Sequence, residues 1–278
     1  MRKRVGYFGM AILAFAVSFL VAYVSQKTTR WFLGVAFDMT FLESAPIVNM
    51  AEHISFVLVF GLWYNIGLKR FRYAKTSIKK VTMPRNLVGV MVLTLGVIFF
   101  TEGAMNLIIP YLPREVLEAY RELSEPVAGD GNPVANFTGS FLAPIGEEFI
   151  FRGVMLYFLL KSIKGLKKEK ALFWVANLVQ ALTFGAFHGN MYQFIHTSVF
   201  AFIVGYMMYK SKTIVVPIAI HMINNVWGIL IVKYVGPFLP YSESANVLYA
   251  VAGFVVMMVG VLLVKRAEEE PEKELSAA

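Results

Sequence analysis

Six charged or polar residues interrupt stretches of sequence that are otherwise apolar. They are Glu147, Glu148, Arg152, His188, His221 and Asn225. Carboxylates and imidazoles can act as general bases, and amides and imidazoles can donate hydrogen bonds to a developing oxyanion. Carboxylates and imidazoles can also bind a metal ion. Because the chain has no cysteine, any catalysis must use carboxylates, histidines or hydroxyls.

Helical geometry divides the charged group into a pair and a single carboxylate. Glu148 and Arg152 are four residues apart, so on a helix they share one face and can form an ion pair. Glu147 is rotated by about 100° and points elsewhere. An ionisable group at the centre of a membrane helix costs roughly 2.5–3.5 kcal/mol, which implies a partner or a water-filled cavity. Pro144 releases the carbonyl of Ser140 and favours a local opening of the helix. We therefore predict that the pair is structural and that Glu147 is available for chemistry.

The later histidines supply groups that can assist a carboxylate. His188 can join Glu147 in holding and deprotonating a water molecule. His221 and Asn225 are four residues apart, so both can point at one small volume and donate hydrogen bonds to an oxyanion. The other two histidines have no polar residue at helical spacing and are predicted to make ordinary interhelical hydrogen bonds; they are His53 and His196.

The elements that must position these residues are membrane-spanning helices. The chain is 58% hydrophobic and 16% charged, whereas soluble domains have about 25% charged residues. A bilayer core is crossed by roughly 20 apolar residues in a helix. Eight stretches near that length are predicted to span the membrane, at 6–24, 48–67, 87–109, 137–160, 171–188, 192–209, 214–232 and 246–264. The expected fold is an all-α, polytopic membrane helix bundle of about eight transmembrane helices.

The charges between these stretches predict how the bundle is oriented. Basic residues follow the second, fourth, sixth and eighth stretches, and glutamates dominate the loop after the third. By the positive-inside rule, both termini are cytoplasmic, in a multi-pass protein of the lipid bilayer that would lie in the cell membrane of a prokaryote. The acidic segment 268–278 is expected to be solvated. The net charge of +8 acts as a topology signal, and nucleic-acid binding is excluded because no basic soluble domain is present.

The polar residues also form motifs that resemble a known family. Glu147-Glu148-x-x-x-Arg152, Phe184-x-x-x-His188 and His221-x-x-x-Asn225 are similar to the three motifs of the CAAX protease and bacteriocin-processing (CPBP, or Abi) family of intramembrane proteases, which includes Ras-converting enzyme. Each motif lies in its own predicted span. The resemblance covers residues 137–232, the expected catalytic core, whereas the helices of 1–136 and the last helix and tail of 233–278 match no motif.

The resemblance implies a glutamate-dependent endopeptidase that needs no cofactor. The positions that match the family's catalytic residues are Glu147, His188, His221 and Asn225, and the supporting positions are Glu148, Arg152 and Phe184. Glu147 would activate water with His188, and His221 and Asn225 would stabilise the oxyanion. The implied substrate is a membrane-associated peptide or a prenylated CAAX protein, although many prokaryotic relatives serve bacteriocin processing or immunity.

Two other interpretations remain open at this stage. Glu147, His188 and His221 could form a zinc site with an open water position, although no His-Glu-x-x-His helix is present. Alternatively, the intramembrane charges could line the path of a transporter or belong to a scaffold without catalysis. One geometric problem also needs an answer. If both spans ran straight from the interface, His188 would lie about 27 Å and His221 about 13 Å from the same side. We therefore expect either that residues 171–175 lie partly along the membrane surface before the fifth span enters it, or that the helices are tilted and staggered.

Overall fold

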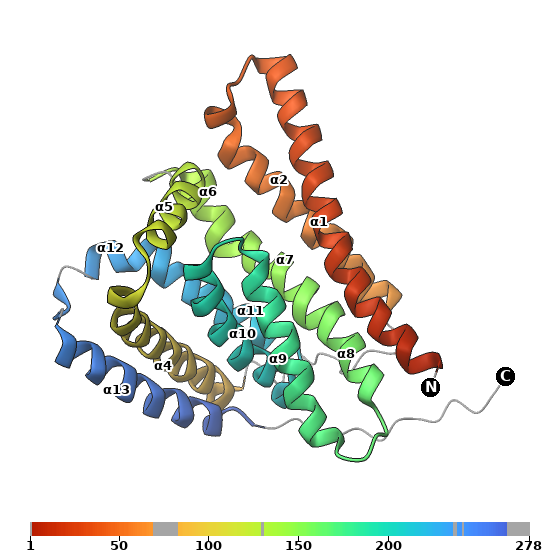
Figure 1. The fold of residues 1–278 in the computed structure, drawn as a ribbon, viewed down its shortest axis with the longest axis vertical. Coiled ribbons are helices and arrows are strands. Elements are labelled where there is room, and N and C mark those ends of the chain that lie inside the picture. The colour runs from red at the N-terminus through yellow and green to blue at the C-terminus, as the bar shows by residue number, and fades with distance from the viewer. Residues whose placement is uncertain (1, 69–82, 129–130, 236–237, 241, 266–278) are drawn as a thin grey trace.

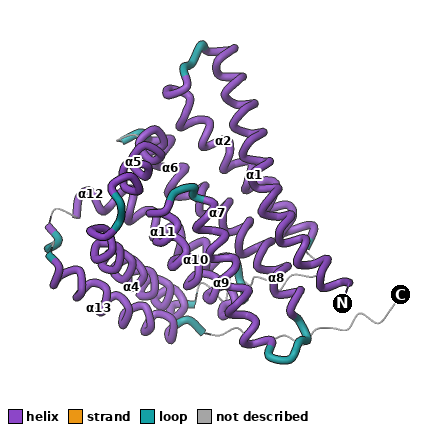
Figure 2. The backbone as a smooth tube through the Cα atoms, viewed as in Figure 1, coloured by secondary structure: helices purple, strands orange, loops and turns teal. Residues whose placement is uncertain are grey.

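The computed structural model describes residues 2–68, 83–128, 131–235, 238–240 and 242–265. Within these ranges the chain is helical and no strand occurs, which confirms the all-α class; short loops join the helices (Figures 1 and 2). The α-helices are α1 (Arg2–Phe37), α2 (Phe41–Leu62), α4 (Pro84–Ile108), α5 (Arg114–Ala128), α6 (Pro133–Phe137), α7 (Ala143–Glu148), α8 (Leu156–Ile163), α9 (Glu169–Phe187), α10 (Met191–Ser211), α11 (Val215–Val226), α12 (Val232–Val235) and α13 (Glu243–Leu263). Most of the basic loop after the second predicted span and all of the acidic segment 268–278 lie outside the described residues.

The described helices support a polytopic membrane protein. Six are long and apolar enough to cross a bilayer: Lys3–Phe37, Phe41–Gly67, Pro84–Tyr111, Glu169–Phe187, Met191–Ser211 and Glu243–Leu263. A shorter apolar helix covers Val215–Ile231, and the fourth predicted span corresponds to the helical run of α6 to α8. The count of eight spans stays a prediction. The predicted end of the first span near residue 24 is wrong, because α1 continues without a break to Phe37.

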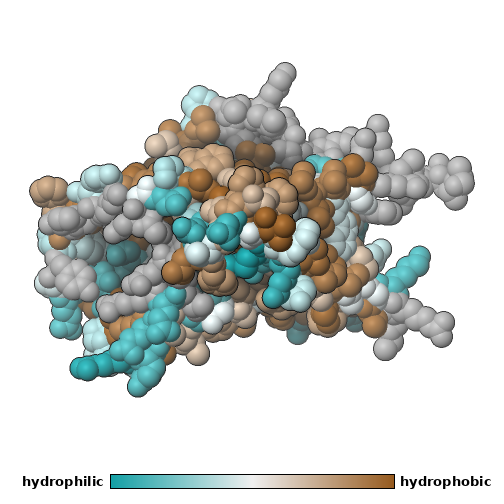
Figure 3. Space-filling view, turned by 90° about the horizontal axis from the view of Figure 1, so that it is seen from above, coloured by the Kyte–Doolittle hydropathy of each residue, from teal (hydrophilic) through white to brown (hydrophobic). Residues whose placement is uncertain are grey.

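The outer surface of the bundle is apolar, as a lipid-facing surface requires. Large exposed hydrophobic side chains occur on α1, α4, α9 and α13 in particular, for example Leu20, Met91, Val175 and Leu262. On the face shown in Figure 3, brown apolar side chains lie at the surface beside teal polar ones. Apolar side chains therefore lie both on the outer surface and in the interior of the bundle. The buried charged residues lie in the interior only.

Helices α4 and α13 form a close antiparallel pair (Figure 1). Glycines recur every seven residues along α4, and a Cβ added to Gly96 would lie only 2.1 Å from the backbone nitrogen of Met257 on α13. A Cβ on Gly253 of α13 would lie 2.2 Å from the backbone nitrogen of Phe100. The two backbones are thus in direct contact, an arrangement that small residues permit in membrane bundles. Helix α11 packs on α4, so this pair supports one of the helices that carry the site.

Helices α9 and α10 form a hairpin that is held by buried amides. Asn177 donates its side-chain N–H to the carbonyl of Phe202 at 2.8 Å, and Gln180 donates to the carbonyl of Ala201 at 3.1 Å. Both side chains are fully buried, where an amide without a partner would be costly. These bonds fix the hairpin, and His188 follows directly after α9 in the turn at its end.

The first two helices form a second hairpin that packs against the centre of the chain. Helix α1 contacts α8 and the residues just before it, and α2 contacts α7. The α2–α7 contact is close at Gly146, where an added Cβ would lie 2.9 Å from the Cβ of Phe56 and 3.4 Å from the carbonyl oxygen of His53. The N-terminal helices therefore form one wall of the region that contains the predicted site.

Candidate active site

The helix that carries the charged motif is irregular on both sides of it. From Pro133 to Ile163 the chain is helical, but the segments Thr138–Leu142 and Phe149–Met155 are π-helical and flank α7. Pro144 lacks the N–H that would bond to the carbonyl of Ser140, which accounts for the wider turn before it. The predicted local opening is therefore confirmed. Wide turns of this kind inside α-helices are frequent at functional sites.

Glu148 and Arg152 form the predicted ion pair in the interior. Arg152 Nη1 lies 3.0 Å from Glu148 Oε1, and the two side chains are fully buried. The Nδ1 of His221, on α11, lies 2.8 Å from the same carboxylate oxygen. The guanidinium of Arg152 also lies 4.5 Å from the centre of the Phe184 ring on α9. The Glu148 carboxylate thus joins α11 to the helix of the charged motif, and Arg152 extends the cluster to α9, where Phe184 packs against it as expected.

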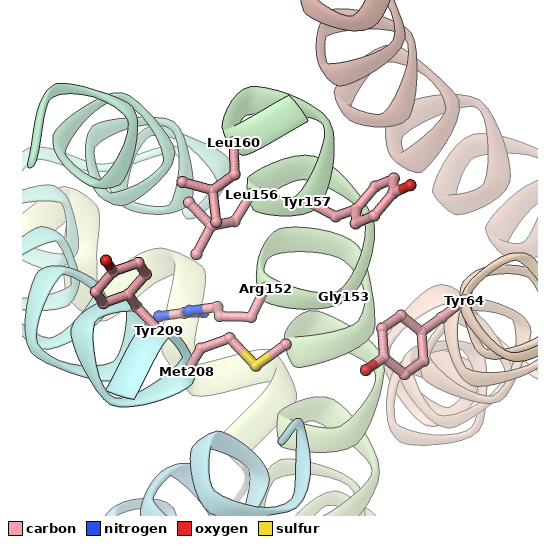
Figure 4. Close-up of a pocket in the computed structure, with 8 residues that line it drawn as sticks. All are labelled: Tyr64, Arg152, Gly153, Leu156, Tyr157, Leu160, Met208 and Tyr209. Carbon is pink, nitrogen blue, oxygen red and sulfur yellow. The ribbon is translucent and has the colours of Figure 1, made fainter. Parts of the chain in front are cut away.

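A small cavity lies on the Arg152 side of this cluster (Figure 4). Arg152 extends from its helix toward Tyr209 and Met208 of α10, and Tyr64 borders the cavity from the N-terminal hairpin. Glu147 is not among the lining residues. The cavity therefore adjoins Arg152 of the buried ion pair and not Glu147.

Glu147 lies between two imidazoles. Its Oε1 is 3.7 Å from Nε2 of His53 on α2, and its Oε2 is 3.8 Å from Nε2 of His221. The side chain of Glu147 is 11% exposed, and among the described residues no lysine or arginine lies within ion-pair distance of its carboxylate. Both contacts are longer than the 2.7–3.2 Å of a direct N–H···O hydrogen bond. A buried carboxylate is therefore placed beside two nitrogen atoms without being bound tightly by either.

The other ring nitrogen of each histidine near the site is fixed by an acceptor. Nδ1 of His53 lies 2.8 Å from the carbonyl of Asn49, and Nδ1 of His188 lies 2.9 Å from the carbonyl of Phe184. Nδ1 of His221 meets Glu148, as described above. Since carbonyl and carboxylate oxygens only accept, each Nδ1 carries the hydrogen. This assignment leaves Nε2 of all three rings as the atom that is available for chemistry.

His188 and His221 approach each other through Phe184. The Phe184 ring centre lies 4.9 Å from that of His188 and 5.9 Å from that of His221. The buried residues Thr213 and Ile214 directly precede α11, and the stagger of the two spans across the bilayer stays a prediction. His188 is half-buried, and no nitrogen of its ring comes within 4 Å of Glu147 among the described residues. It lies in the same region but does not touch the carboxylate.

Asn225 forms a hydrogen bond with the neighbouring helix. Its side-chain N–H donates to the carbonyl of Gly139 at 2.8 Å. Gly139 belongs to the π-helical segment before α7, so this bond joins α11 to the helix that carries Glu147. An amide nitrogen has two hydrogens, and one remains for another acceptor.

Sequence reasoning missed the proximity of His53 to Glu147. It predicted an ordinary interhelical hydrogen bond for His53, whereas the structure places this ring against the proposed base. The available signal was weak, since a single histidine on an apolar helix has no partner at helical spacing. His196, the fourth histidine, is half-buried on α10 and has no such contact with Glu147.

The ligands of the alternative zinc site are not assembled. Within the described part of the chain, which includes all four histidines, no group of three or more His, Asp or Glu side chains is placed to hold a metal ion. Glu147 and His221 are neighbours, but His188 is turned toward the aromatic rings of Phe184 and Phe187.

Fold and site together define a polytopic membrane protein with a buried glutamate beside histidines, and comparison with known proteins specifies it further. Residues 131–227 match the family model of the Rce1-like type II CAAX prenyl endopeptidases, a range that includes all three motifs. "Putative membrane peptidase YdiL" of Bacillus subtilis (strain 168) is 28% identical over 114 residues, which cover 41% of this chain and 43% of that protein. The alignment thus spans less than half of the curated relative. No solved structure matches the chain. The resemblance to the CPBP protease family is confirmed for the central segment.

Proposed function

We propose that this protein is an intramembrane endopeptidase in which Glu147 activates a water molecule. The observation that supports it best is the contrast between two adjacent carboxylates. Glu148 is bound by Arg152 at 3.0 Å and by His221 at 2.8 Å, so its charge is committed to packing. The carboxylate of Glu147 lies 3.7 and 3.8 Å from imidazole nitrogens. Its oxygen lone pairs are therefore available to accept a proton. The match to a family of endopeptidases agrees with this division.

The proposed reaction is general-base hydrolysis of a peptide bond. Glu147 accepts a proton from water as the water oxygen bonds to the peptide carbonyl carbon. The same proton then passes to the leaving nitrogen as the carbon–nitrogen bond breaks, and a carboxylic acid and an amine are released. Such proton transfer by a placed side chain contributes about 10²–10⁴-fold to a rate.

The remaining motif residues hold the water and the oxyanion in this proposal. His188 assists Glu147 in holding the water, as the family resemblance implies, and this requires its ring to turn from Phe184. Asn225 has one amide hydrogen left for an oxyanion. His221, as an imidazolium whose Nδ1–H is bound by Glu148, can donate through Nε2. Glu148, Arg152 and Phe184 hold these groups in place.

The proposed substrate is a membrane-associated peptide, with prenylated CAAX proteins as the class to test first. The matched family model is described as a CAAX prenyl endopeptidase, and the bacterial relative is named only as a membrane peptidase. An assay panel should therefore hold a prenylated CAAX peptide, its unprenylated form and several unmodified membrane proteins.

Replacement of the base is the direct test. Glu147→Gln keeps size and hydrogen bonding but removes the proton acceptor, so we expect a folded protein without turnover. Asn225→Ala should lose about 10²–10³-fold, as is typical for one oxyanion donor. Glu102→Gln, a carboxylate on α4, is the matched control and should keep activity. Undiminished cleavage by Glu147→Gln would refute the assignment, and no cleavage of any panel member by the unmodified protein would favour a scaffold or transporter.

The metal-free form of the mechanism has its own test. Proteolysis by Glu147 and hydrogen-bond donors requires no ion, so chelators should leave the cleavage rate unchanged, and purified protein should contain no stoichiometric zinc by elemental analysis. Activity that is lost on chelation and restored by zinc would instead support the zinc protease.

A further inference from the structure

His53 belongs to a part of the chain that lies outside the family match. The match covers residues 131–227, whereas His53 lies on α2, in the N-terminal hairpin. Its side chain is 11% exposed, and its Nε2 is 3.7 Å from Oε1 of Glu147. The N-terminal hairpin therefore brings an imidazole to the carboxylate of the central segment.

Local contacts fix the orientation of this ring. The carbonyl of Asn49 accepts the hydrogen of His53 Nδ1 at 2.8 Å, so in the neutral ring Nε2 is the unprotonated nitrogen. The ring of Phe56 packs edge-on against the imidazole, with a centroid distance of 5.6 Å and an interplanar angle of 83°. One nitrogen is thus anchored on the helix, and the other is aimed at Glu147.

The approach of α2 to α7 is also specific. Gly146 directly precedes Glu147, and any larger residue would meet Phe56 and the backbone of His53. The absence of a side chain at Gly146 lets the two helices come this close, as small residues do in membrane bundles. The distance between His53 and Glu147 therefore follows from a backbone contact and not from a long, adjustable side chain.

We infer that His53 is a further catalytic residue, which takes the place proposed above for His188 and holds the attacking water together with Glu147, because the His188 ring faces Phe184; this inference rests on the proposed function. Neutral Nε2 of His53 and ionised Oε1 of Glu147 are both acceptors, and at 3.7 Å they do not bond to each other directly. A water between them donates one hydrogen to each. Its oxygen lone pairs then point away from both groups, toward the carbonyl carbon of a bound peptide.

Proton transfer balances in this arrangement. As the water oxygen bonds to the carbonyl carbon, the hydrogen that faces Glu147 moves to the carboxylate and later to the leaving nitrogen. The hydrogen that faces His53 stays on the attacking oxygen and is released when the product acid ionises. His53 thus orients the nucleophile, and Glu147 remains the base.

Kinetics of a variant that keeps the ring can test this role. His53→Phe retains an aromatic ring against Phe56 but removes Nε2. We expect kcat to fall about 10²-fold, within the range for a group that assists proton transfer, with little change in KM and in thermal unfolding. His196→Phe, at the half-buried histidine of α10, is the matched control and should keep the rate. Each variant is made in the full chain and assayed in detergent with the substrate panel.

A second measurement does not depend on cleavage or on the folding of a His53 variant. The chain has four histidines, so nitrogen NMR of histidine-labelled protein can resolve each ring. We expect His53 to show a hydrogen on Nδ1, and its Nε2 resonance to shift when Glu147 is replaced by glutamine. The Nε2 resonance of His196 should not move.

The outcomes distinguish the role of His53 from the proposed protease function. If the unmodified protein cleaves a substrate and His53→Phe cleaves it at the same rate, the inference is overturned and the protease stands. If the chemical shift of His53 Nε2 is the same in Glu147→Gln as in the unmodified protein, the inference is overturned as well. If the unmodified protein cleaves nothing in the panel, the proposed function fails, and the role of His53 in it fails too.

Discussion

Two adjacent glutamates show how position on a helix decides the role of a side chain. Glu147 and Glu148 are chemically identical and both lie in the interior, yet their directions differ by about 100°. One faces a guanidinium and the Nδ1–H of an imidazole, and the other faces two Nε2 atoms. The charge of Glu148 is used within its own helix and to join that helix to α11. The charge of Glu147 remains available to a proton.

Loss of Arg152 should destabilise the protein strongly. Arg152→Ala leaves Glu148 buried without its cation and removes the contact with the Phe184 ring, and breaking a buried pair typically costs about 3–5 kcal/mol. Thermal unfolding in detergent and extraction yield are the measurements. Arg30→Ala is a suitable control, since the guanidinium of Arg30 also stacks on a ring, that of Phe41, but near the surface. A fully stable and active Arg152→Ala protein would show that the pair has no bracing role.

For single residues, the sequence was sufficient to predict side-chain contacts within one helix. It was insufficient to predict contacts between helices. The Glu148–Arg152 pair was predictable because a spacing of four residues fixes the geometry. The approach of His53 to Glu147 was not, since the two residues are far apart in the sequence and meet through helix packing. The bond from His221 to Glu148 was missed for the same reason, because spacing along one helix does not specify its neighbours.

The elements that carry the site are irregular where the chemistry is proposed. Alpha-helical geometry is interrupted before α7 and again after it, and Glu147 and Glu148 end the regular turn between the two π-helical segments. Pro144 made the first interruption predictable. The second, over Phe149–Met155, has no proline and contains the buried Arg152. Its position follows from packing against neighbouring helices, which the sequence pattern does not specify.

A methyl group on Gly146 should move α2 away from α7. In Gly146→Ala the new carbon would lie 2.9 Å from Phe56 Cβ, closer than carbon atoms pack, so the helices must separate. We expect a fall in cleavage rate larger than the loss of thermal stability, because His53 and Glu147 move apart. Gly61→Ala is the control, as its added carbon would meet the Phe149 ring at an ordinary 3.4 Å. Equal rates for the two variants would mean that the close α2–α7 contact does not matter for catalysis.

Helix lengths show a similar division between what was and was not predictable. Apolar stretches of about 20 residues, the length that a bilayer sets, placed most of the long apolar helices well. The first helix continues to Phe37, and no proline or glycine occurs between residues 25 and 33 to interrupt it. The stagger of α11 stays a prediction, because the spacing of residues along one helix does not fix its depth relative to another helix.

At the scale of the whole molecule, the segment that matches the family model is enclosed by helices outside that match. The N-terminal hairpin contacts the helix of the charged motif on one side, and the α4–α13 pair supports α11 on another. These helices come from both ends of the chain. The site is therefore a product of the entire bundle, although its motifs occupy a third of the sequence.

Contacts between chain segments that are far apart also bear on orientation. The Arg4 side chain near the N-terminus donates to the carbonyl of Lys164 at 3.2 Å, so the N-terminus and the basic loop after α8 lie at the same end. At the start of α4, Arg85 donates to the carbonyl of Leu263 at 3.1 Å, which joins the beginning of α4 to the end of α13. The structure thus groups basic segments that the charge pattern assigns to one side.

The basic segments are predicted to lie on the cytoplasmic side of the membrane, and reporter fusions can test this. Positive charges in short loops are retained on the cytoplasmic side during insertion, so reporters placed after Lys75 and after Lys167 should both be cytoplasmic. One placed near Glu122 on α5, which follows an odd number of predicted spans, should lie on the opposite side. The Lys167 fusion is the most informative, because the contact between Arg4 and Lys164 ties that loop to the N-terminus. A cytoplasmic signal near Glu122 together with an external one after Lys167 would invert the orientation. Opposite sides for the Lys75 and Lys167 fusions would break the eight-span topology, since an even number of crossings must separate them.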